Sequence, residues 1–209
     1  MKRAWANKKA LSYRAAKLIK TRGMIVIRAF IGIEFDSVCK KYIYELQQRL
    51  KKYAVKGRWK SSDNFHLTLK FLDEINAKQQ KQIDEAMLGI CAGQNPFRLE
   101  ITGLGAFSGR ESIRVVWLGL SGNLHQLQPL AVKIENSMAK LGFPPEKRPY
   151  SPHITIGQDI IFECPFDQMK SPIEPIKFGP IDVNKVVLFK SEQIQNKRVY
   201  SIVSEYTLQ

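Results

Sequence analysis

One tetrapeptide pattern occurs twice in this chain and uses two of its three histidines. The copies are His66-Leu67-Thr68-Leu69 and His153-Ile154-Thr155-Ile156. In an extended strand successive side chains point to opposite faces, so the histidine and the threonine share one face and the two aliphatic residues share the other. Each copy therefore predicts a strand that buries its aliphatic face in a core and presents one imidazole and one hydroxyl to a cleft.

A second pair of matched segments extends the repeat. Phe30-Ile31-Gly32-Ile33 precedes the first copy and Trp117-Leu118-Gly119-Leu120 precedes the second, and the offset is 87 residues for both pairs (117 − 30 and 153 − 66). In each half, this strand is followed by a helix-like stretch and then by the His-x-Thr strand. The pattern indicates an internal duplication of a β-α-β unit. Two related halves meeting face to face would place their His-x-Thr strands across a shared cleft.

The rest of the chain predicts alternating strands and helices. Strands are expected at 25–35, 66–72, 97–102, 114–120, 183–190 and 198–208, and helices at 38–53, 76–91 and 123–141. Residues 103–110 contain three glycines but match no phosphate-binding fingerprint, so we interpret them as a hairpin connection. Residues 163–180 are proline-rich and predict a mostly irregular connection with one strand.

Size and cysteine usage narrow the class of protein. A chain of 209 residues fits one sizeable domain or two small lobes that share a core. The three cysteines are odd in number and far apart, which argues against a disulfide framework and fits a reducing compartment, so we expect a cytoplasmic protein. The sequence contains no closely spaced set of Cys and His residues of the kind that predicts a zinc site. No apolar run reaches the length of a membrane span. We expect a monomer without metal or cofactor.

Positive charge is concentrated at the N-terminus. The formal net charge is +14, and residues 1–23 hold eight basic residues and no acid, which leaves +6 for the remainder. This balance suggests an anionic partner, usually nucleic acid, although a solvated basic surface accounts for the charge equally well. Residues 1–23 also predict a weakly amphipathic helix. It could be an RNA- or membrane-binding arm, a targeting presequence, or an extension upstream of a start at Met24, which we favour.

Two imidazoles across a cleft are suited to acid–base catalysis. Histidine titrates near neutrality, so one ring can be neutral and take a proton from water while the other is protonated and donates to a leaving oxygen. The hydroxyls of Thr68 and Thr155 can donate hydrogen bonds to phosphate oxygens, where charge develops in the transition state. A single His-x-Thr strand more often holds a histidine with an ordinary structural role. Two copies at matched positions favour a catalytic pair, His66 and His153, that needs no metal.

The motifs resemble those of the 2H phosphoesterase superfamily, and within it those of the RNA 2′,3′-cyclic phosphodiesterases, historically called 2′-5′ RNA ligases. The resemblance extends from Met24 to about Leu208. It is strongest in four stretches: RAFIGIE at 28–34, NFHLTLKFL at 64–72, LGFPP at 141–145 and RPYSPHITI at 148–156.

The resemblance implies a single bilobal α+β domain at 24–209, with two antiparallel sheets around a central cleft and helices on the outside. It implies hydrolysis of 2′,3′-cyclic phosphate at RNA 3′ ends to a 2′-phosphomonoester. His66 and His153 would be the catalytic pair, and Thr68 and Thr155 would bind the phosphate. We assign His66 as the acid and His153 as the base, although the residues allow either order.

Two positions depart from the family pattern. Gln158 stands where an arginine is frequent, two residues beyond the second motif, and Asp73 stands where glycine is common. The missing positive charge puts affinity or substrate range in doubt. Candidates to supply it are Arg148, Lys70, Arg58 and Arg110, and candidates to stack on a base are Tyr150, Phe30 and Trp59. Of these we include Arg148 and Tyr150 among the substrate-binding residues and expect Phe30 to pack in the core.

Three other functions remain open at this stage. RNA ligation is the same chemistry in reverse, with a 5′-hydroxyl in place of water. A small cyclic nucleotide or a 2′-5′-linked oligonucleotide could be the substrate. A non-catalytic RNA-binding module is the alternative from another class, and the two intact histidine and threonine pairs argue against it.

Overall fold

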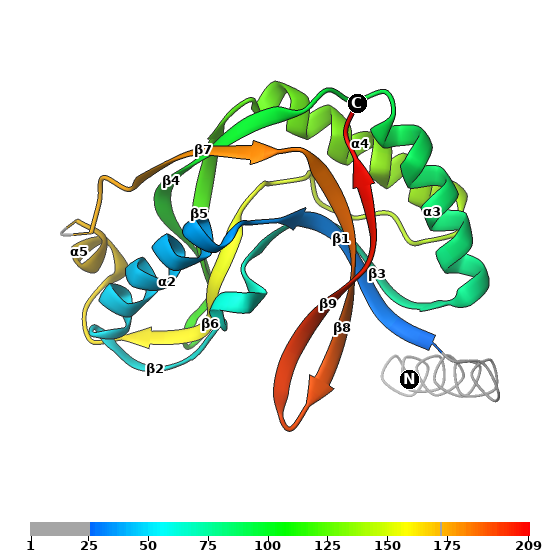
Figure 1. Cartoon of the computed structure of the whole chain (residues 1–209). Helices are drawn as coiled ribbons and strands as arrows, with labels where there is room; N and C mark the ends of the chain where they lie inside the picture. Colours follow the sequence, from blue (N-terminus) through cyan, green and yellow to red (C-terminus); the bar gives the residue numbers. More distant parts are fainter. Residues whose placement is uncertain (1–25, 172) are drawn as a thin grey trace.

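The computed structural model describes residues 26–171 and 173–209 (Figure 1). The helix predicted at 1–23, and the domain boundary placed there, lie outside these residues. In chain order the elements are β1 (Val26–Glu34), α2 (Ser37–Lys51), β2 (Ala54–Trp59), the 3-10 turn η1 (Ser62–Asn64), β3 (His66–Asn76), α3 (Ala77–Cys91), β4 (Phe97–Ser108), β5 (Ile113–Gly122), α4 (Leu124–Lys140), β6 (Ile154–Phe162), α5 (Phe166–Lys170), β7 (Lys177–Val183), β8 (Lys185–Ile194) and β9 (Lys197–Thr207).

The described strands form two antiparallel sheets, with the orders β3-β1-β8-β9 and β2-β6-β5-β4-β7. β1 and β3 pair in the first sheet, and their counterparts β5 and β6 pair in the second. The halves also exchange strands, because β4 from the first half pairs with β5 while β8 from the second half pairs with β1. This arrangement confirms the predicted duplicated α+β fold.

The helices bury the faces that the sequence predicts. In α2 the apolar positions Ile43, Leu46 and Leu50 are buried, and Asp36 caps the helix by accepting from the amide of Cys39 at 2.7 Å. α3 and α4 pack together against the first sheet, and α2 contacts the second sheet through β7 (Figure 1). None of the described helices is both long and apolar enough to cross a membrane.

The glycine-rich segment 103–110 differs from its prediction. β4 continues through it to Ser108, so that the turn to β5 begins only at residue 109. Gly103 has a φ of +61° at a point where the register with β5 shifts, and a Cβ on Gly105 would lie 2.1 Å from the Trp117 ring. The glycines therefore mark a bulge and a close approach within a strand: the positive φ at residue 103 favours glycine, and the Trp117 ring leaves no room for a side chain at residue 105.

Two further segments were not predicted as they fold. β2 is mostly exposed and polar and lies at an edge of the second sheet, so it lacks the alternation that would identify it in the sequence. The segment 163–180, predicted to be mostly irregular with one strand, contains the beginning of β7 and also the short helix α5, which was not predicted.

Candidate active site

The fold brings the two His-x-Thr motifs together. His66 is the first residue of β3 and His153 immediately precedes β6. These strands belong to different sheets yet contact each other, so the motifs meet where the two sheets adjoin. In both motifs the aliphatic residues are buried while the histidines and threonines are half-buried, as the alternation predicts.

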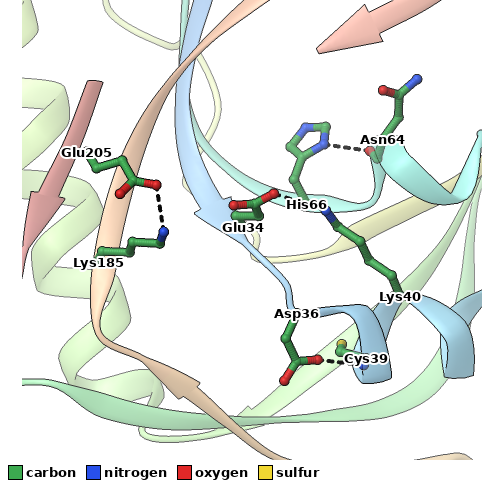
Figure 2. A network of polar contacts seen from close by, with 8 residues as sticks. All are labelled: Glu34, Asp36, Cys39, Lys40, Asn64, His66, Lys185 and Glu205. Carbon is green, nitrogen blue, oxygen red and sulfur yellow. Dashed lines mark hydrogen bonds and ion pairs between the residues drawn. The ribbon is translucent and has the colours of Figure 1, made fainter. Parts of the chain in front are cut away.

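Both histidines are held in the same way by the main chain. The Nδ1 atom of His66 lies 2.7 Å from the carbonyl oxygen of Asn64 (Figure 2), and Nδ1 of His153 lies 2.7 Å from the carbonyl oxygen of Ser151. A carbonyl can only accept a hydrogen bond, so Nδ1 must be the protonated nitrogen in each neutral ring. This leaves Nε2 of each histidine as the atom that can take up or give a proton.

The hydroxyl of Thr68 lies beside the reactive nitrogen of its own motif. Its Oγ1 is 3.0 Å from Nε2 of His66. With the ring neutral, the hydroxyl donates to this nitrogen, and with the ring protonated the direction reverses. Thr155 occupies the equivalent place on β6, where it pairs in register with Trp117. Each half therefore presents an imidazole and a hydroxyl on one strand face.

Aromatic rings surround both imidazoles. The ring centroids of Phe30 and Tyr200 lie 4.6 and 5.1 Å from that of His66. On the other side, Phe107 and Trp117 lie 5.3 and 6.3 Å from His153. Phe30 and Trp117 are the equivalent positions of the internal repeat, so the duplication extends to the packing of the histidines. Phe30 is buried beneath the His66 ring, which is the core role expected for it.

Burial makes His66 a weak base in the ligand-free protein. It lowers the pKa of His66 to about 4, and the nearby positive charges of Lys60, Lys40 and His153 act in the same direction. The Asn64 carbonyl opposes the shift. Lys40 itself pairs with Glu34 at 3.0 Å (Figure 2). His66 is therefore neutral at neutral pH.

Tyr150 and Arg148, the two other predicted substrate-binding residues, lie in the loop that leads to His153. The Tyr150 hydroxyl donates to the main-chain carbonyl of Thr68 at 3.2 Å, and burial raises the pKa of this phenol. The hydroxyl thus links this loop to the first motif. The side chain of Arg148 is exposed.

The other candidates for the missing positive charge fall in different environments. Lys70 is buried and donates to Glu135 at 2.9 Å and to the carbonyl of Pro144 at 2.7 Å, so it serves the core and not the cleft. Arg58 lies directly opposite Gln158 in the β2–β6 ladder and forms an ion pair with Asp159. Arg58 is therefore placed to supply charge near the position that lacks an arginine.

Two buried amides that the sequence analysis did not single out fix the surroundings of the motifs. Gln47 of α2 donates to the carbonyls of Lys60 and Ile156, at 2.8 and 2.9 Å. Asn64 donates to the carbonyl of Arg198 at 2.7 Å. A polar residue within the apolar stripe of α2 was a visible signal for Gln47. No pattern signalled Asn64, because its partners are main-chain atoms.

A cavity of about 1090 Å³ adjoins the histidine site. Phe30 and Tyr200, which contact His66, form part of its wall, and the basic residues Arg58, Lys60 and Arg198 form another part. Within the described ranges, no three His, Cys, Asp or Glu side chains gather closely enough to hold a metal ion. Metal-free activity stays a prediction.

Sequence comparisons place these features among known proteins. The family described as LigT-like phosphoesterase matches the chain twice, at 33–117 and 118–200, which agrees with the internal duplication. A protein of Aquifex aeolicus named RNA 2′,3′-cyclic phosphodiesterase is 31% identical over 190 residues, covering 88% of this chain and 99% of its own length. One of the same name from Thermotoga maritima is 31% identical over 181 residues, covering 86% and 94%.

Solved structures show the same fold. Escherichia coli LigT complexed with 3′-AMP aligns with a TM-score of 0.70 at 26% identity, covering 88% of this chain and 99% of that one. A protein of Thermus thermophilus aligns with a TM-score of 0.71 at 22% identity, covering 87% and 98%. Because the Thermus thermophilus protein is only 22% identical, its similarity to this chain shows a shared fold and nothing further.

Proposed function

The chain belongs to the LigT-like phosphoesterase family, and from that membership we propose that it hydrolyses 2′,3′-cyclic phosphates at RNA 3′ ends to 2′-phosphomonoesters. One observation carries the proposal. Two histidines from equivalent strands have Nδ1 bound to a main-chain carbonyl at 2.7 Å, and each keeps Nε2 for proton transfer. Relatives named RNA 2′,3′-cyclic phosphodiesterase, similar over most of the chain, support the choice of substrate.

The reaction replaces one phosphorus–oxygen bond by another. Water attacks the phosphorus, and the neutral imidazole takes a proton from it as the new P–O bond forms. The bond from phosphorus to the 3′ oxygen breaks, and the protonated imidazole gives its proton to that oxygen. The phosphate remains on the 2′ oxygen. Each proton transfer contributes roughly 10²–10⁴-fold to the rate, and the hydroxyls of Thr68 and Thr155 donate to the non-bridging oxygens.

Binding of the phosphate determines which role His66 can take. With its pKa near 4, His66 is neutral at neutral pH, and its Nε2 carries no proton. An adjacent phosphate favours the imidazolium form and raises this pKa. The acid role assigned to His66 therefore requires that the proton be taken up together with the substrate, while His153 acts as the base.

The test is hydrolysis of a short RNA ending in a 2′,3′-cyclic phosphate, with EDTA present. Mass spectrometry detects the added water, and a phosphatase specific for 3′-phosphates distinguishes the 2′- from the 3′-phosphate product. We expect a 2′-phosphate and a rate that EDTA does not change. A 3′-phosphate product would show that the other ester bond breaks. A rate abolished by EDTA would contradict the metal-free mechanism, and absence of turnover would favour a binding module.

A further inference from the structure

Three basic side chains converge on the cavity beside the histidines. Arg58 belongs to β2, Lys60 follows that strand and Arg198 belongs to β9, and all three line the same cavity. Burial lowers the pKa of Lys60, and the charges of Arg198 and Arg58 lower it further, which shows that the three cations lie near one another. Like charges in such proximity are unfavourable unless an anion joins them.

The main chain holds two of these residues firmly. The Lys60 amide donates to the carbonyl of Ile156 at 3.1 Å, and its carbonyl accepts from the buried Gln47. Asn64 joins Arg198 to the active site, because its side chain donates to the Arg198 carbonyl while its own carbonyl accepts from His66. The main chains of Lys60 and Arg198 therefore have a fixed place relative to the catalytic pair.

Acidic residues do not neutralise this wall of the cavity. Its basic lining residues are Arg28, Lys51, Arg58, Lys60, Lys197 and Arg198, against Asp63 and Asp73. Arg28 pairs with Asp73 and Arg58 with Asp159. In the described part of the chain, none of the ion pairs involves Lys60 or Arg198. These two cations have no acidic partner there, and Arg198 donates a side-chain hydrogen bond to the Ser191 hydroxyl at 3.4 Å.

The position of the cavity indicates which anion it receives. Its lining includes neither the two histidines nor the two motif threonines, so it lies beside the reacting phosphate and not around it. Its volume of about 1090 Å³ lies near the upper end of the range for small-molecule sites, about 300–1,000 Å³. Two exposed aromatic rings in its wall, Tyr44 and Phe71, offer surfaces on which bases can stack. Single-stranded RNA matches this combination of charge, length and aromatic surface.

We propose that Lys60 and Arg198, flanked by Arg58, bind the phosphodiester immediately upstream of the cyclic phosphate. The substrate is then an oligonucleotide end in preference to a nucleoside cyclic monophosphate. This inference rests on the proposed function, since it assumes that the histidines act on the 3′ terminus. It also gives Arg58 a role beside Gln158, where the family frequently has an arginine.

Three substrates isolate the contribution of the upstream phosphodiester charge to kcat/KM. They are adenosine 2′,3′-cyclic phosphate, the diribonucleotide ApA with a 2′,3′-cyclic phosphate, and the same diribonucleotide with an uncharged methylphosphonate linkage. We expect kcat/KM to be about tenfold higher for the charged than for the uncharged dinucleotide, as for one charge-assisted hydrogen bond. Lys60→Gln and Arg198→Gln should each reduce this ratio toward one. Lys56→Gln, an exposed change on β2 outside the cavity, should preserve it. Equal rates for the two dinucleotides would overturn the inference.

A binding measurement keeps this inference distinct from the hydrolase proposal. Fluorescence anisotropy of a labelled RNA tetranucleotide with an ordinary 3′-hydroxyl requires no turnover. We expect each glutamine variant to raise Kd about tenfold and to make the slope of log K against log salt shallower by about 0.7 for a lost phosphate contact. If the variants lost RNA binding but the parent protein hydrolysed no cyclic phosphate, the hydrolase proposal alone would be refuted. Normal hydrolysis with unchanged Kd and slope would overturn the phosphodiester site alone.

Discussion

The phenolic hydroxyl of Tyr150 donates a hydrogen bond to the main-chain carbonyl of Thr68 across 3.2 Å. Tyr150 lies in the loop that leads to the second motif, and Thr68 belongs to the first. The bond therefore connects the two halves of the duplicated fold at the point where their His-x-Thr strands meet. Its loss should affect both stability and the alignment of the Thr68 hydroxyl.

Tyr150→Phe removes this donor and leaves the ring in place. We expect a loss of about 1 kcal/mol in the free energy of unfolding and a decrease in kcat that exceeds any rise in KM, because the change displaces the Thr68 hydroxyl, which we propose binds the phosphate. Chemical denaturation and steady-state kinetics measure the two effects, with Tyr53→Phe as the control at a more exposed tyrosine. A rise in KM alone would indicate that Tyr150 contacts the substrate directly.

His66→Ala and His153→Ala should each reduce kcat on an RNA cyclic phosphate by about 10²–10⁴-fold, because each removes one proton-transfer group. His125→Ala is the matched control, since this third histidine is exposed at the start of α4. Full activity in either motif variant would refute the two-histidine mechanism.

Thr68→Val and Thr155→Val remove a hydroxyl with little change in side-chain volume. We expect kcat/KM to decrease by about ten- to a hundredfold for each, since a donor to the developing charge is lost. Thr68→Ser retains the hydroxyl beside His66 Nε2 and should recover most of the activity. If serine and valine at this position gave the same rate, the hydroxyl would have no catalytic role.

The protonation of His66 should depend on a bound anion. In the free protein its pKa lies near 4, below the usual 6.5. Phosphate favours the imidazolium and raises the pKa, so the complex binds more protons than the free protein and affinity for phosphate increases as pH falls from the bound pKa toward about 4. NMR titration of the ring with and without inorganic phosphate measures both values. An unchanged pKa in saturating phosphate would exclude the acid role for His66.

Lys70 should prove structural. Lys70→Met keeps an apolar stem but removes the donor to Glu135 and to the Pro144 carbonyl. We expect a decrease of about 1–3 kcal/mol in the free energy of unfolding, because the Glu135 carboxylate and the Pro144 carbonyl lose a charged donor. Activity per folded molecule should stay within about twofold of the parent. A large rise in KM without loss of stability would instead place Lys70 in the substrate site. Lys133→Met, at an exposed position on α4, controls for the loss of a charge.

Much of the site follows from local sequence. The alternation in His66-Leu67-Thr68-Leu69 decides which side chains are buried, because strand geometry has a period of two. The matched offset in the second half predicts two equivalent strands, and the apolar stripes of α2 and α4 predict their buried faces. Where this reasoning failed, in 103–110 and in β2, the local signal had another cause: glycines served a bulge and a close ring contact, and an exposed edge strand carries no apolar alternation.

The contacts between elements required the tertiary structure. The sequence by itself determined the residue types of the site and the strand faces that carry them, since these depend on neighbours a few positions apart. Only the fold decided that β4 and β8 exchange between sheets, that Asn64 links His66 to Arg198, and that Arg58 and Lys60 meet Arg198 in one cavity. Most of these contacts join segments more than a hundred residues apart, and several use main-chain carbonyls. Every residue has a main-chain carbonyl, so the residue type in the sequence does not indicate which carbonyl will accept a given hydrogen bond.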